Sequence, residues 1–569
     1  MLFALTLFAG RLVQLQGLQS VRYRTLASQQ RSQVAPVPVL RGSVTAAGGA
    51  VLAMTVQNDQ VFADPGLIPL ASRGQVAARL AAPLQMPAAA ILGKLEHPTS
   101  RDYVLLKNSV STTTAVTVTA LQLPGVALHP FYTRSYPAGD LGANLIGFTH
   151  ADTVTGQGGT VITGQAGVEE QYNALLTGRP GSEQYEATTS LEPIAGTEVM
   201  LRQPRPAGNL QLTIQPDIQY AAEQECRRQV AATKARNCSI IVMQAHTAKI
   251  LAMAEYPTFS PARPQTVAQT TDIPVADVFA PGSTAKVITV AAALEQGGQT
   301  PLSTYRVPDS IVVDGFSFHD AEHHPVARYT VAGILAYSSN DGMVQVVQHV
   351  TPQQQYHYLR AFGLGSPSGL GLPGESAGLL QPPAQWNAAA GLAQERYTLS
   401  FGQGVAATAV QMASVYATIA NGGVRVQPSL VAGTTSAAGQ FTAPPAPPRR
   451  RVIRAATARE LMTILQQVPK VDTKQGEPWG EIAGYTVAAK TGTAQVGPNL
   501  SQYGSSYIGI APASNPQLVV AVNLQDPQNQ YFGDAVAGPA FYHVMKFALQ
   551  TMKIPPDGGT PPYIRLARP

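Results

Sequence analysis

The sequence predicts an α+β fold in which an antiparallel sheet is flanked by helices. β-branched runs at 239–243 and 249–254 indicate one hairpin. A second pair of runs, at 506–511 and 518–524, indicates another. A stretch at 216–234 with the character of a helix precedes the first hairpin. Hairpin strands that pack against helices are typical of this class.

More than one domain is expected from the length. The 569 residues exceed the roughly 250–300 at which a single hydrophobic core stops growing. A stretch at 202–209 with two prolines and a glycine predicts the main boundary. We therefore divide the chain into a first segment at 1–18, a domain at 19–205, a second domain at 206–555 and a tail at 556–569.

The composition argues against a nucleic-acid-binding protein. Charged residues make up 12% of the chain, and the net charge of +5 is spread thinly over the sequence. Proteins that bind nucleic acid gather Lys and Arg among aromatic residues, and the sequence contains no such cluster. Binding of nucleic acid is therefore not expected.

Two cysteines, Cys226 and Cys238, are 12 residues apart. A single pair argues against a zinc site, which needs more Cys or His ligands. In an oxidising compartment the pair would close a disulfide between the helix at 216–234 and the strand after it. Two unpaired thiols that pack as small apolar side chains are an equal alternative.

The N-terminus is apolar for only ten residues before Arg11. A helix that spans a membrane needs about 20 apolar residues. A secretory signal has a basic start and a small-residue cleavage site, and both features are missing here. These residues alone therefore fit neither pattern.

Three short strings carry the predicted chemistry of the second domain: Ser283-Thr-Ala-Lys286, Ser338-Ser-Asn340 and Lys490-Thr-Gly-Thr493. Each is weak alone, because a long chain contains several such strings by chance. Together, in this order, they indicate a serine acyl-transfer site. The alternatives are a surface Ser and Lys for the first string and a helix cap for the second.

Ser283 is the predicted nucleophile. The apolar periodicity of 287–294 indicates a helix that starts at Ser283, so Lys286 lies one turn later on the same face. A serine hydroxyl is a poor nucleophile until a base removes its proton. Lys286 is such a base only if burial or a nearby cation lowers its pKa, and Lys490 is the candidate cation.

With these strings the chain resembles the class B penicillin-binding proteins over essentially its full length. Further strings shared with the family are Arg134-Ser-Tyr-Pro-Ala-Gly139, Gly164-Gln-Ala-Gly-Val-Glu169 and Ser400-Phe-Gly-Gln-Gly404. Residues 305–315 and 552–556 look most like the division-type, FtsI-like enzymes of actinobacteria. The resemblance implies a transpeptidase fold at 206–555, after an elongated, β-rich pedestal (dimerisation) domain at 19–205. It also implies that 1–18 is the outer half of a membrane anchor whose start lies upstream.

The resemblance implies a role for each residue of the three strings. Ser338 relays a proton between the two lysines and the leaving group, and Asn340 holds an amide of the substrate peptide. Thr491 and Thr493 offer hydroxyls to the substrate carboxylate. Gly492 allows the substrate to approach the strand closely. The backbone N–H groups of Ser283 and Thr493 form the oxyanion hole.

Two sites depart from the usual pattern. Asp341 follows Asn340, where we expect a carboxylate to pair with a lysine and disturb its pKa. Ala280 replaces the Glu that many relatives carry, for which we expect an effect on the scaffold only. A group made of His319, Asp320, His323 and His324 suggests a metal site, but the default interpretation is a solvated loop without metal.

The function that the resemblance implies is peptidoglycan D,D-transpeptidation, through a Ser283 acyl-enzyme and with release of D-Ala. The implied ligands are D-Ala-D-Ala stem peptides and covalently bound β-lactams, and no cofactor is needed. The implied partners are the cell membrane, a SEDS-family glycan polymerase and division proteins, with the catalytic domain outside the cell on a single-pass anchor. The alternatives are a D,D-carboxypeptidase, a serine β-lactamase, a β-lactam sensor and a scaffold with a dead site.

Overall fold

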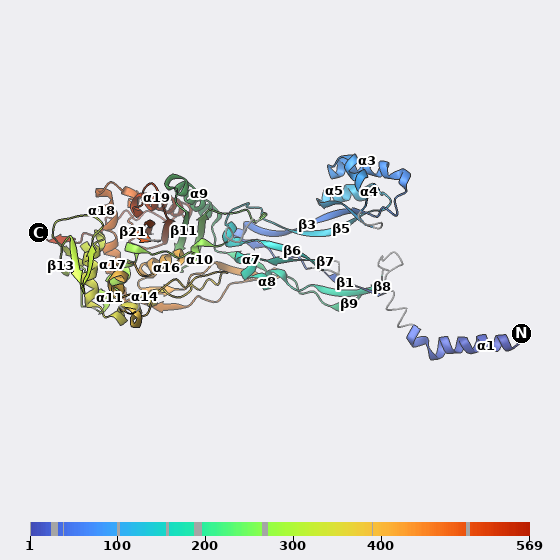
Figure 1. Ribbon diagram of the computed structural model, residues 1–569, viewed down its shortest axis with the longest axis horizontal. Coiled ribbons are helices and arrows are strands. Elements are labelled where there is room, and N and C mark those ends of the chain that lie inside the picture. Colours follow the sequence, from blue (N-terminus) through green and yellow to red (C-terminus); the bar gives the residue numbers. More distant parts are fainter. Residues whose placement is uncertain are drawn as a thin grey trace.

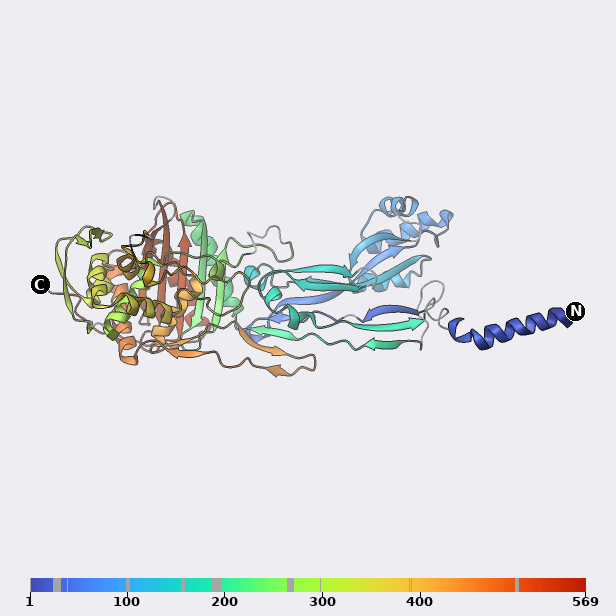
Figure 2. The same cartoon turned by 60° about the horizontal axis from the view of Figure 1, so that its bottom comes forward.

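The computed structural model describes residues 2–23, 32–37, 39–98, 103–154, 159–186, 196–263, 271–296, 298–387, 389, 391–496 and 501–568. The molecule is elongated (Figures 1 and 2). A rounded domain lies at one end, long strands extend from it, and the helix α1 (Leu2–Val13) lies at the opposite end.

A five-stranded antiparallel sheet forms the centre of the rounded domain. Its strand order is β12-β11-β23-β22-β21. The predicted hairpins are both present, because the β-branched runs form its strands: β11 (Asn237–Gln244), β12 (Ile250–Tyr256), β21 (Ala488–Val496), β22 (Gln502–Ala511) and β23 (Leu518–Gln525). The α+β prediction is therefore confirmed, and β21, which carries Lys490, lies at an edge of the sheet.

Helices cover both faces of this sheet. On one face α9 (Pro216–Thr233) and α19 (Gly533–Thr551) pack into an apolar core that includes strand residues such as Val520 and Val522. On the other face lies α16 (Ala409–Ala420), whose twelve residues are all buried. A helix that is buried on all sides is typical of the middle of a domain.

The disulfide Cys226–Cys238 joins α9 to β11. Both sulfur-bearing residues are fully buried in the core between the helix and the sheet. Of the two alternatives that the sequence left open, the structure therefore has the disulfide.

A helical lobe lies beyond α16. Its main helices are α11 (Lys286–Gln296), α12 (Val331–Ala336), α13 (Asn340–Val346), α14 (Pro352–Phe362) and α17 (Ala455–Leu465). Smaller elements are α10 (Ile273–Ala276), α15 (Glu395–Ser400), α18 (Val468–Lys474), the hairpin β14 (Ser310–Val313) and β15 (Phe316–His319), and the pair β17 (Val424–Val426) and β20 (Arg449–Arg451).

The pedestal is built on long strands. β3 (Val51–Ala63) pairs with β2 (Val44–Thr45), β4 (Val104–Val110) and β5 (Val126–Ser135). The sheet continues through β10 (Asn209–Leu212) to β18 (Val431–Thr435) and β19 (Phe441–Thr442) of the second domain. Residues from both sides of 202–209 therefore share one sheet.

The other pedestal elements form separate small units. The helices α3 (Arg73–Leu84), α4 (Ala88–Glu96) and α5 (Thr112–Ala120) have a core of their own. The remaining elements are β6 (Thr149–Val154), β7 (Gly159–Gly164), α6 (Ala143–Ile146), α7 (Gly167–Gln171), α8 (Asn173–Thr177), β1 (Ser32–Val37), β8 (Gly181–Glu186) and β9 (Val199–Arg202).

A buried ionic network gives Arg134 and Glu169, two residues of the strings shared with the family, a structural role. The carboxylate of Glu169 accepts hydrogen bonds from Arg41 at 2.8 Å and from Arg134 at 2.7 Å. The side chains of all three are at most 2% exposed. Charges without water must be paired, so these residues hold the base of the pedestal together.

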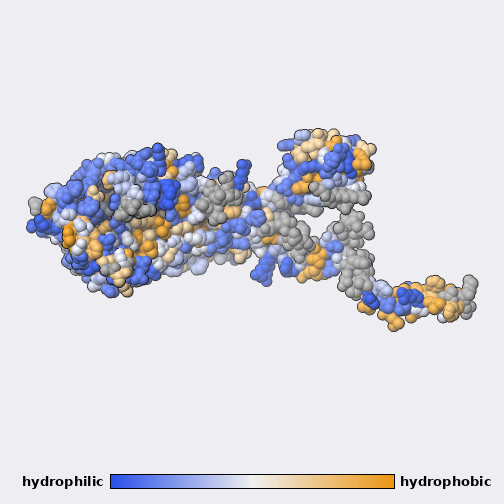
Figure 3. Space-filling model, in the orientation of Figure 1, coloured by the Kyte–Doolittle hydropathy of each residue, from blue (hydrophilic) through white to orange (hydrophobic). Residues whose placement is uncertain are grey.

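The two ends of the chain differ. The last residues lie along the rounded domain, where β24 (Ala567–Arg568) pairs with β16 (Ala327–Thr330) and β16 with β13 (Thr304–Val307). At the N-terminus α1 passes into a π-helical turn at Gln14–Leu18 and exposes apolar side chains, Phe3 and Phe8 among them (Figure 3). Among the described helices, none has the length and apolar character that crossing a membrane requires.

Candidate active site

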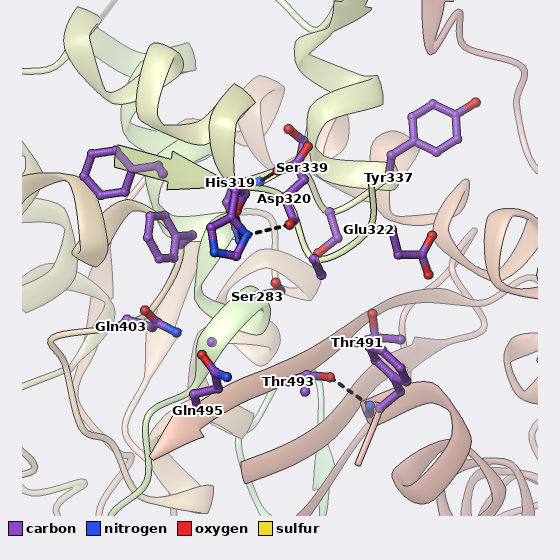
Figure 4. A pocket seen from close by; sticks show the side chains of 18 of the residues that line it. Ser283, His319, Asp320, Glu322, Tyr337, Ser339, Gln403, Thr491, Thr493 and Gln495 are labelled. Atoms are coloured by element: carbon purple, nitrogen blue, oxygen red, sulfur yellow. Dashed lines mark hydrogen bonds between the residues drawn. The ribbon is translucent and has the colours of Figure 1, made fainter. Parts of the chain in front are cut away.

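A cleft of about 730 Å³ lies between the edge strand β21 and the helical lobe. Five of the predicted site residues line it: Ser283, Ser338, Asn340, Thr491 and Thr493. Figure 4 shows Ser283 between β21, with Thr491 and Thr493, and the loop that carries His319 and Asp320. Three strings that are far apart in the sequence therefore meet in one cavity.

Ser283 lies in a turn that is tightly packed against the sheet. The turn, Gly282–Ala285, is a 3-10 helix, and α11 begins only at Lys286. The predicted helix start is thus correct in place, but its first turn is wound more tightly. Gly282 has φ of +53°, and a Cβ there would lie 3.0 Å from the carbonyl oxygen of Thr493. Among the described residues no hydrogen bond fixes the Ser283 hydroxyl, which is half-buried in the cleft wall.

Lys286 is fully buried and points to the second string. Its Nζ contacts the carbonyl oxygen of Ser338, the Ser338 hydroxyl at 3.3 Å and Asn340 Oδ1 at 2.8 Å. Burial lowers the pKa of Lys286 well below its usual range, and the charge of Lys490 lowers it further. The three oxygens match the three N–H donors of an ammonium group, and loss of one proton would leave Lys286 with two donors and a lone pair.

The second string forms the corner between α12 and α13. Ser338 has φ of +61°, a left-handed conformation that few residues other than glycine adopt. This conformation turns the chain so that Ser338 and Asn340 both reach Lys286. Ser339 is the N-cap of α13, and its hydroxyl accepts a hydrogen bond from the N–H of Gly342 at 2.9 Å. The site residues and the helix cap, which we treated as alternatives in the sequence analysis, are therefore both present in the same string.

The third string lies on β21, opposite the corner. Lys490 is buried, and its Nζ donates to the carbonyl and hydroxyl oxygens of Thr491, each at 3.2 Å. Burial lowers the pKa of Lys490 to about 8, against the attraction of Asp472 and Asp534. The hydroxyl oxygen of Thr493 accepts from the N–H of Gly533 at 3.0 Å, so its own proton remains available to a ligand.

The packing of the chain also requires a glycine at position 492. A Cβ at Gly492 would lie 2.4 Å from Ser506 Oγ and 2.9 Å from the carbonyl oxygen of Pro281. The chain itself therefore occupies the space beside this glycine. The absent side chain lets the strand pack against the turn before Ser283, while the close approach of a substrate at this glycine stays a prediction.

Asp341 and the His-Asp loop also differ from expectation. Asp341 is fully buried, and among the described residues neither of its carboxylate oxygens has a hydrogen-bond partner, so it forms no ion pair with a lysine. Its charge nevertheless raises the pKa of Lys286, as expected. Burial raises its pKa to about 7. Asp320 and His324 were expected on a solvated loop, but they bind each other at 2.9 Å with side chains that are 9% and 18% exposed. Among the described residues no three His, Cys, Asp or Glu side chains are grouped to hold a metal ion.

Asp320 was not predicted as a site residue. Its carboxylate lines the cleft and accepts hydrogen bonds from the backbone N–H groups of Asn340 and Asp341. The sequence offers only a weak signal for this contact, the acidic and His-rich stretch about 20 residues before Asn340.

Comparison with protein families identifies the molecule. Residues 238–546 match the penicillin binding protein transpeptidase domain, and residues 36–212 match the penicillin-binding protein dimerisation domain. The chain belongs to the penicillin-binding protein family.

This penicillin-binding protein has relatives of known name over almost its full length. It is 32% identical to penicillin-binding protein PbpB of Mycolicibacterium smegmatis, over 98% of this chain and 90% of that one. It is 31% identical to the peptidoglycan D,D-transpeptidase FtsI of Escherichia coli K12, over 98% of this chain and 92% of that one. The prediction of a class B penicillin-binding protein, a serine-type peptidoglycan D,D-transpeptidase, is confirmed.

Solved structures agree with the fold. A peptidoglycan synthetase from Bifidobacterium adolescentis has a TM-score of 0.75 at 27% identity and covers 95% of this chain and 100% of its own. Penicillin binding protein 3 from Mycobacterium tuberculosis, complexed with aztreonam, has a TM-score of 0.70 at 27% identity and covers 94% of this chain and 100% of its own. The predicted succession of pedestal and transpeptidase fold is thus confirmed.

Proposed function

We propose that Ser283 carries the acyl group in peptidoglycan cross-linking. Its hydroxyl attacks the penultimate D-Ala carbonyl of a stem peptide, a C–O bond forms, and the C–N bond to the terminal D-Ala breaks. An amine of a second stem peptide then attacks the ester, restores the serine and forms the cross-link. The observation that carries the proposal is that Ser283 lines one cleft with Ser338 and Asn340, which contact the buried Lys286, whose pKa the charge of Lys490 helps to lower.

Lys286 is the proposed base. Its lowered pKa makes the neutral amine more accessible, which a general base requires. The proton taken from Ser283 passes to the departing amine through the Ser338 hydroxyl, which lies 3.3 Å from Lys286 Nζ. Asn340, whose amide oxygen is bound to Lys286, orients the substrate peptide with its amide nitrogen.

The edge strand binds the donor peptide. An extended peptide adds to an exposed strand edge through main-chain hydrogen bonds, and β21 is such an edge. The hydroxyls of Thr491 and Thr493, next to the charge of Lys490, bind the terminal carboxylate. The N–H groups of Ser283 and Thr493 hold the oxyanion, and one such donor contributes about 10²–10³ in rate.

The setting of the enzyme is also part of the proposal. The exposed apolar residues of α1 and its place at the far end from the cleft support a membrane anchor at 1–18. The catalytic domain then acts outside the cell, a compartment that fits the disulfide Cys226–Cys238. Glycan strands come from a separate SEDS-family polymerase, and division proteins are the expected further partners.

Labelling with a fluorescent penicillin tests the function. The full chain is incubated with the probe, and a Ser283→Ala variant serves as the control. Covalent label on the wild type alone supports the acyl-serine site. Absence of label on folded wild-type protein would contradict it and would favour the scaffold with a dead site.

A second measurement separates transfer from hydrolysis. A D-Ala-D-Ala peptide is supplied with and without an acceptor amine, and the products are identified by mass. A product joined to the acceptor supports transpeptidation. Release of D-Ala without transfer would indicate a D,D-carboxypeptidase, and steady hydrolysis of the penicillin would indicate a β-lactamase.

A further inference from the structure

The loop between β15 and β16 places Asp320 beneath the start of α13. One carboxylate oxygen of Asp320, Oδ1, accepts the backbone N–H groups of both Asn340 and Asp341, the latter at 3.0 Å. The first N–H groups of a helix have no partner within the helix. Asp320 supplies that partner, so the position of Asn340 depends on this side chain.

Asn340 connects Asp320 to the chemistry. Its Oδ1 accepts from Lys286 Nζ at 2.8 Å, and its Nδ2 donates to the carbonyl oxygen of His319 at 3.2 Å. Both the backbone and the side chain of Asn340 are therefore held by the 319–320 loop. A shift of this loop would displace the amide oxygen that binds Lys286.

His324 holds the other oxygen of Asp320. The ring Nε2 lies 2.9 Å from Asp320 Oδ2, and Nδ1 lies 2.8 Å from the carbonyl oxygen of Pro325. Carbonyl and carboxylate oxygens accept hydrogen bonds, so the geometry suits a ring with protons on both nitrogens. The backbone N–H of His324 donates to Asp309 at 3.0 Å, which fixes the residue in the loop.

We propose that Asp320 and His324 form a positioning pair for the proposed reaction of Ser283. The cationic ring of His324 orients the carboxylate of Asp320, and Asp320 in turn holds Asn340 where it binds Lys286. The inference rests on the proposed function of Ser283, because its readout is the acylation of that residue. Neither member of the pair reacts with the substrate.

The surroundings of the pair set its response to pH. His324 is faced by Asp320 and Asp309 and lies 6.1 Å, between ring centroids, from Tyr329 of β16. Asp320 is faced by Asp341 of α13 and Lys286 of α11. Burial raises the pKa of Tyr329, and the charges of Tyr337 and Asp320 both raise it further.

The charge of His324 is therefore maintained by its neighbours. Burial lowers the pKa of His324, but its hydrogen bonds to Pro325 and Asp320 outweigh burial, so that the pKa is raised. When the pH rises above that pKa, the ring keeps a single N–H, so one of its two nitrogens presents a lone pair to an oxygen, and the positive charge beside Asp320 is lost.

The test compares acylation rates of the full chain across pH. His324→Gln removes the cation, and His323→Gln is the matched control. His323 is the next residue, also binds a carboxylate, that of Asp309, and has a side chain that is 99% exposed. Rates of labelling by a fluorescent penicillin are measured from pH 6 to pH 9 for wild type and both variants.

At pH 6 we expect His324→Gln to react about tenfold more slowly than wild type, because it loses a charge-assisted hydrogen bond. The ratio of the wild-type rate to the His324→Gln rate should fall towards one as the pH rises and the wild-type ring loses its charge. Titration of Lys286 and Asp341 affects both proteins and largely cancels in the ratio. His323→Gln should match wild type at every pH.

A rescue variant keeps the test decisive if His324→Gln folds poorly. His324→Lys retains a cation that does not titrate in this range, so its rate should match wild type at pH 6 and exceed wild type as the pH rises. A ratio for His324→Gln that is the same at all pH values, or equal effects of the two His→Gln variants, would overturn the inference. A wild type that takes no label would instead contradict the proposed function.

Discussion

Replacing Gly402 by Ala should slow acylation of Ser283 without unfolding the protein. Gly402 has φ of +83°, and its backbone carbonyl accepts the N–H of Gly282 at 3.0 Å. A Cβ at this position would lie 2.0 Å from the carbonyl oxygen of Gly282. Since backbone atoms cannot rotate away, the turn that carries Ser283 must move.

The magnitude follows from that overlap. Ordinary van der Waals contact begins near 3.4 Å, so the turn shifts by roughly 1 Å, and a misplacement of this size costs about 10²-fold in rate. The left-handed backbone alone adds a cost in stability of about 1–2 kcal/mol.

Gly422→Ala is the matched control, because it has φ of +61° and nothing within 4 Å of the added Cβ. This variant has the same cost of placing an alanine in a left-handed backbone conformation, but its Cβ does not overlap with other atoms. The assay is the rate of labelling by a fluorescent penicillin, together with a melting curve. We expect a loss of about 10²-fold for Gly402→Ala and little change for Gly422→Ala. Equal rates for the two folded variants would refute the reasoning.

Three further changes test the stability of the structure. Burial and the charge of Glu375 raise the pKa of the fully buried Asp272 to about 7, so its share of stability is complete below pH 4 and is lost as the pH rises to 7. Wild type should then lose about 2–3 kcal/mol between pH 5 and 8 in urea unfolding, and Asp272→Asn should remove that loss; identical pH curves would contradict the assignment. Replacing Cys226 and Cys238 together by Ala should lower the unfolding free energy by about 3 kcal/mol, as expected for a short closed loop, in the same urea assay. If a reductant lowers the unfolding free energy of wild type no more than that of the variant without cysteines, the disulfide is contradicted. Glu169→Gln should destabilise the pedestal by about 3–5 kcal/mol, because it leaves two buried arginines with reduced compensation, while penicillin labelling continues; loss of labelling in a folded variant would show that the network acts on the cleft.

The sequence predicts the frame of the molecule well, because local patterns determine it. The β-branched runs became β11, β12, β22 and β23, and the helix expected at 216–234 is α9 (Pro216–Thr233). The three motif strings identify the residues that line the cleft because each string is short and keeps its own local conformation. Lys490 could be placed at a strand edge for the same reason.

The contacts between strings could not be predicted in this way. Asp320 is separated from Asn340 by about a helix and a strand, and only the packing of the lobe brings its carboxylate under α13. The burial of Asp341 and the packing role of Gly492 likewise depend on neighbours distant in the chain. No local pattern reports such neighbours.

The strand order of the central sheet has a consequence for how the protein is made. β11 pairs with β12, which follows it directly, and on its other side with β23, so that Asn237 lies opposite Gln525. During synthesis the apolar hairpin of β11 and β12 therefore exists long before its second neighbour. Until β23 is made, the side of β11 that β23 later occupies has unpaired backbone groups that can pair with other chains. A nascent chain that ends before β23 is thus an aggregation hazard, and the last strands of the sheet protect the first.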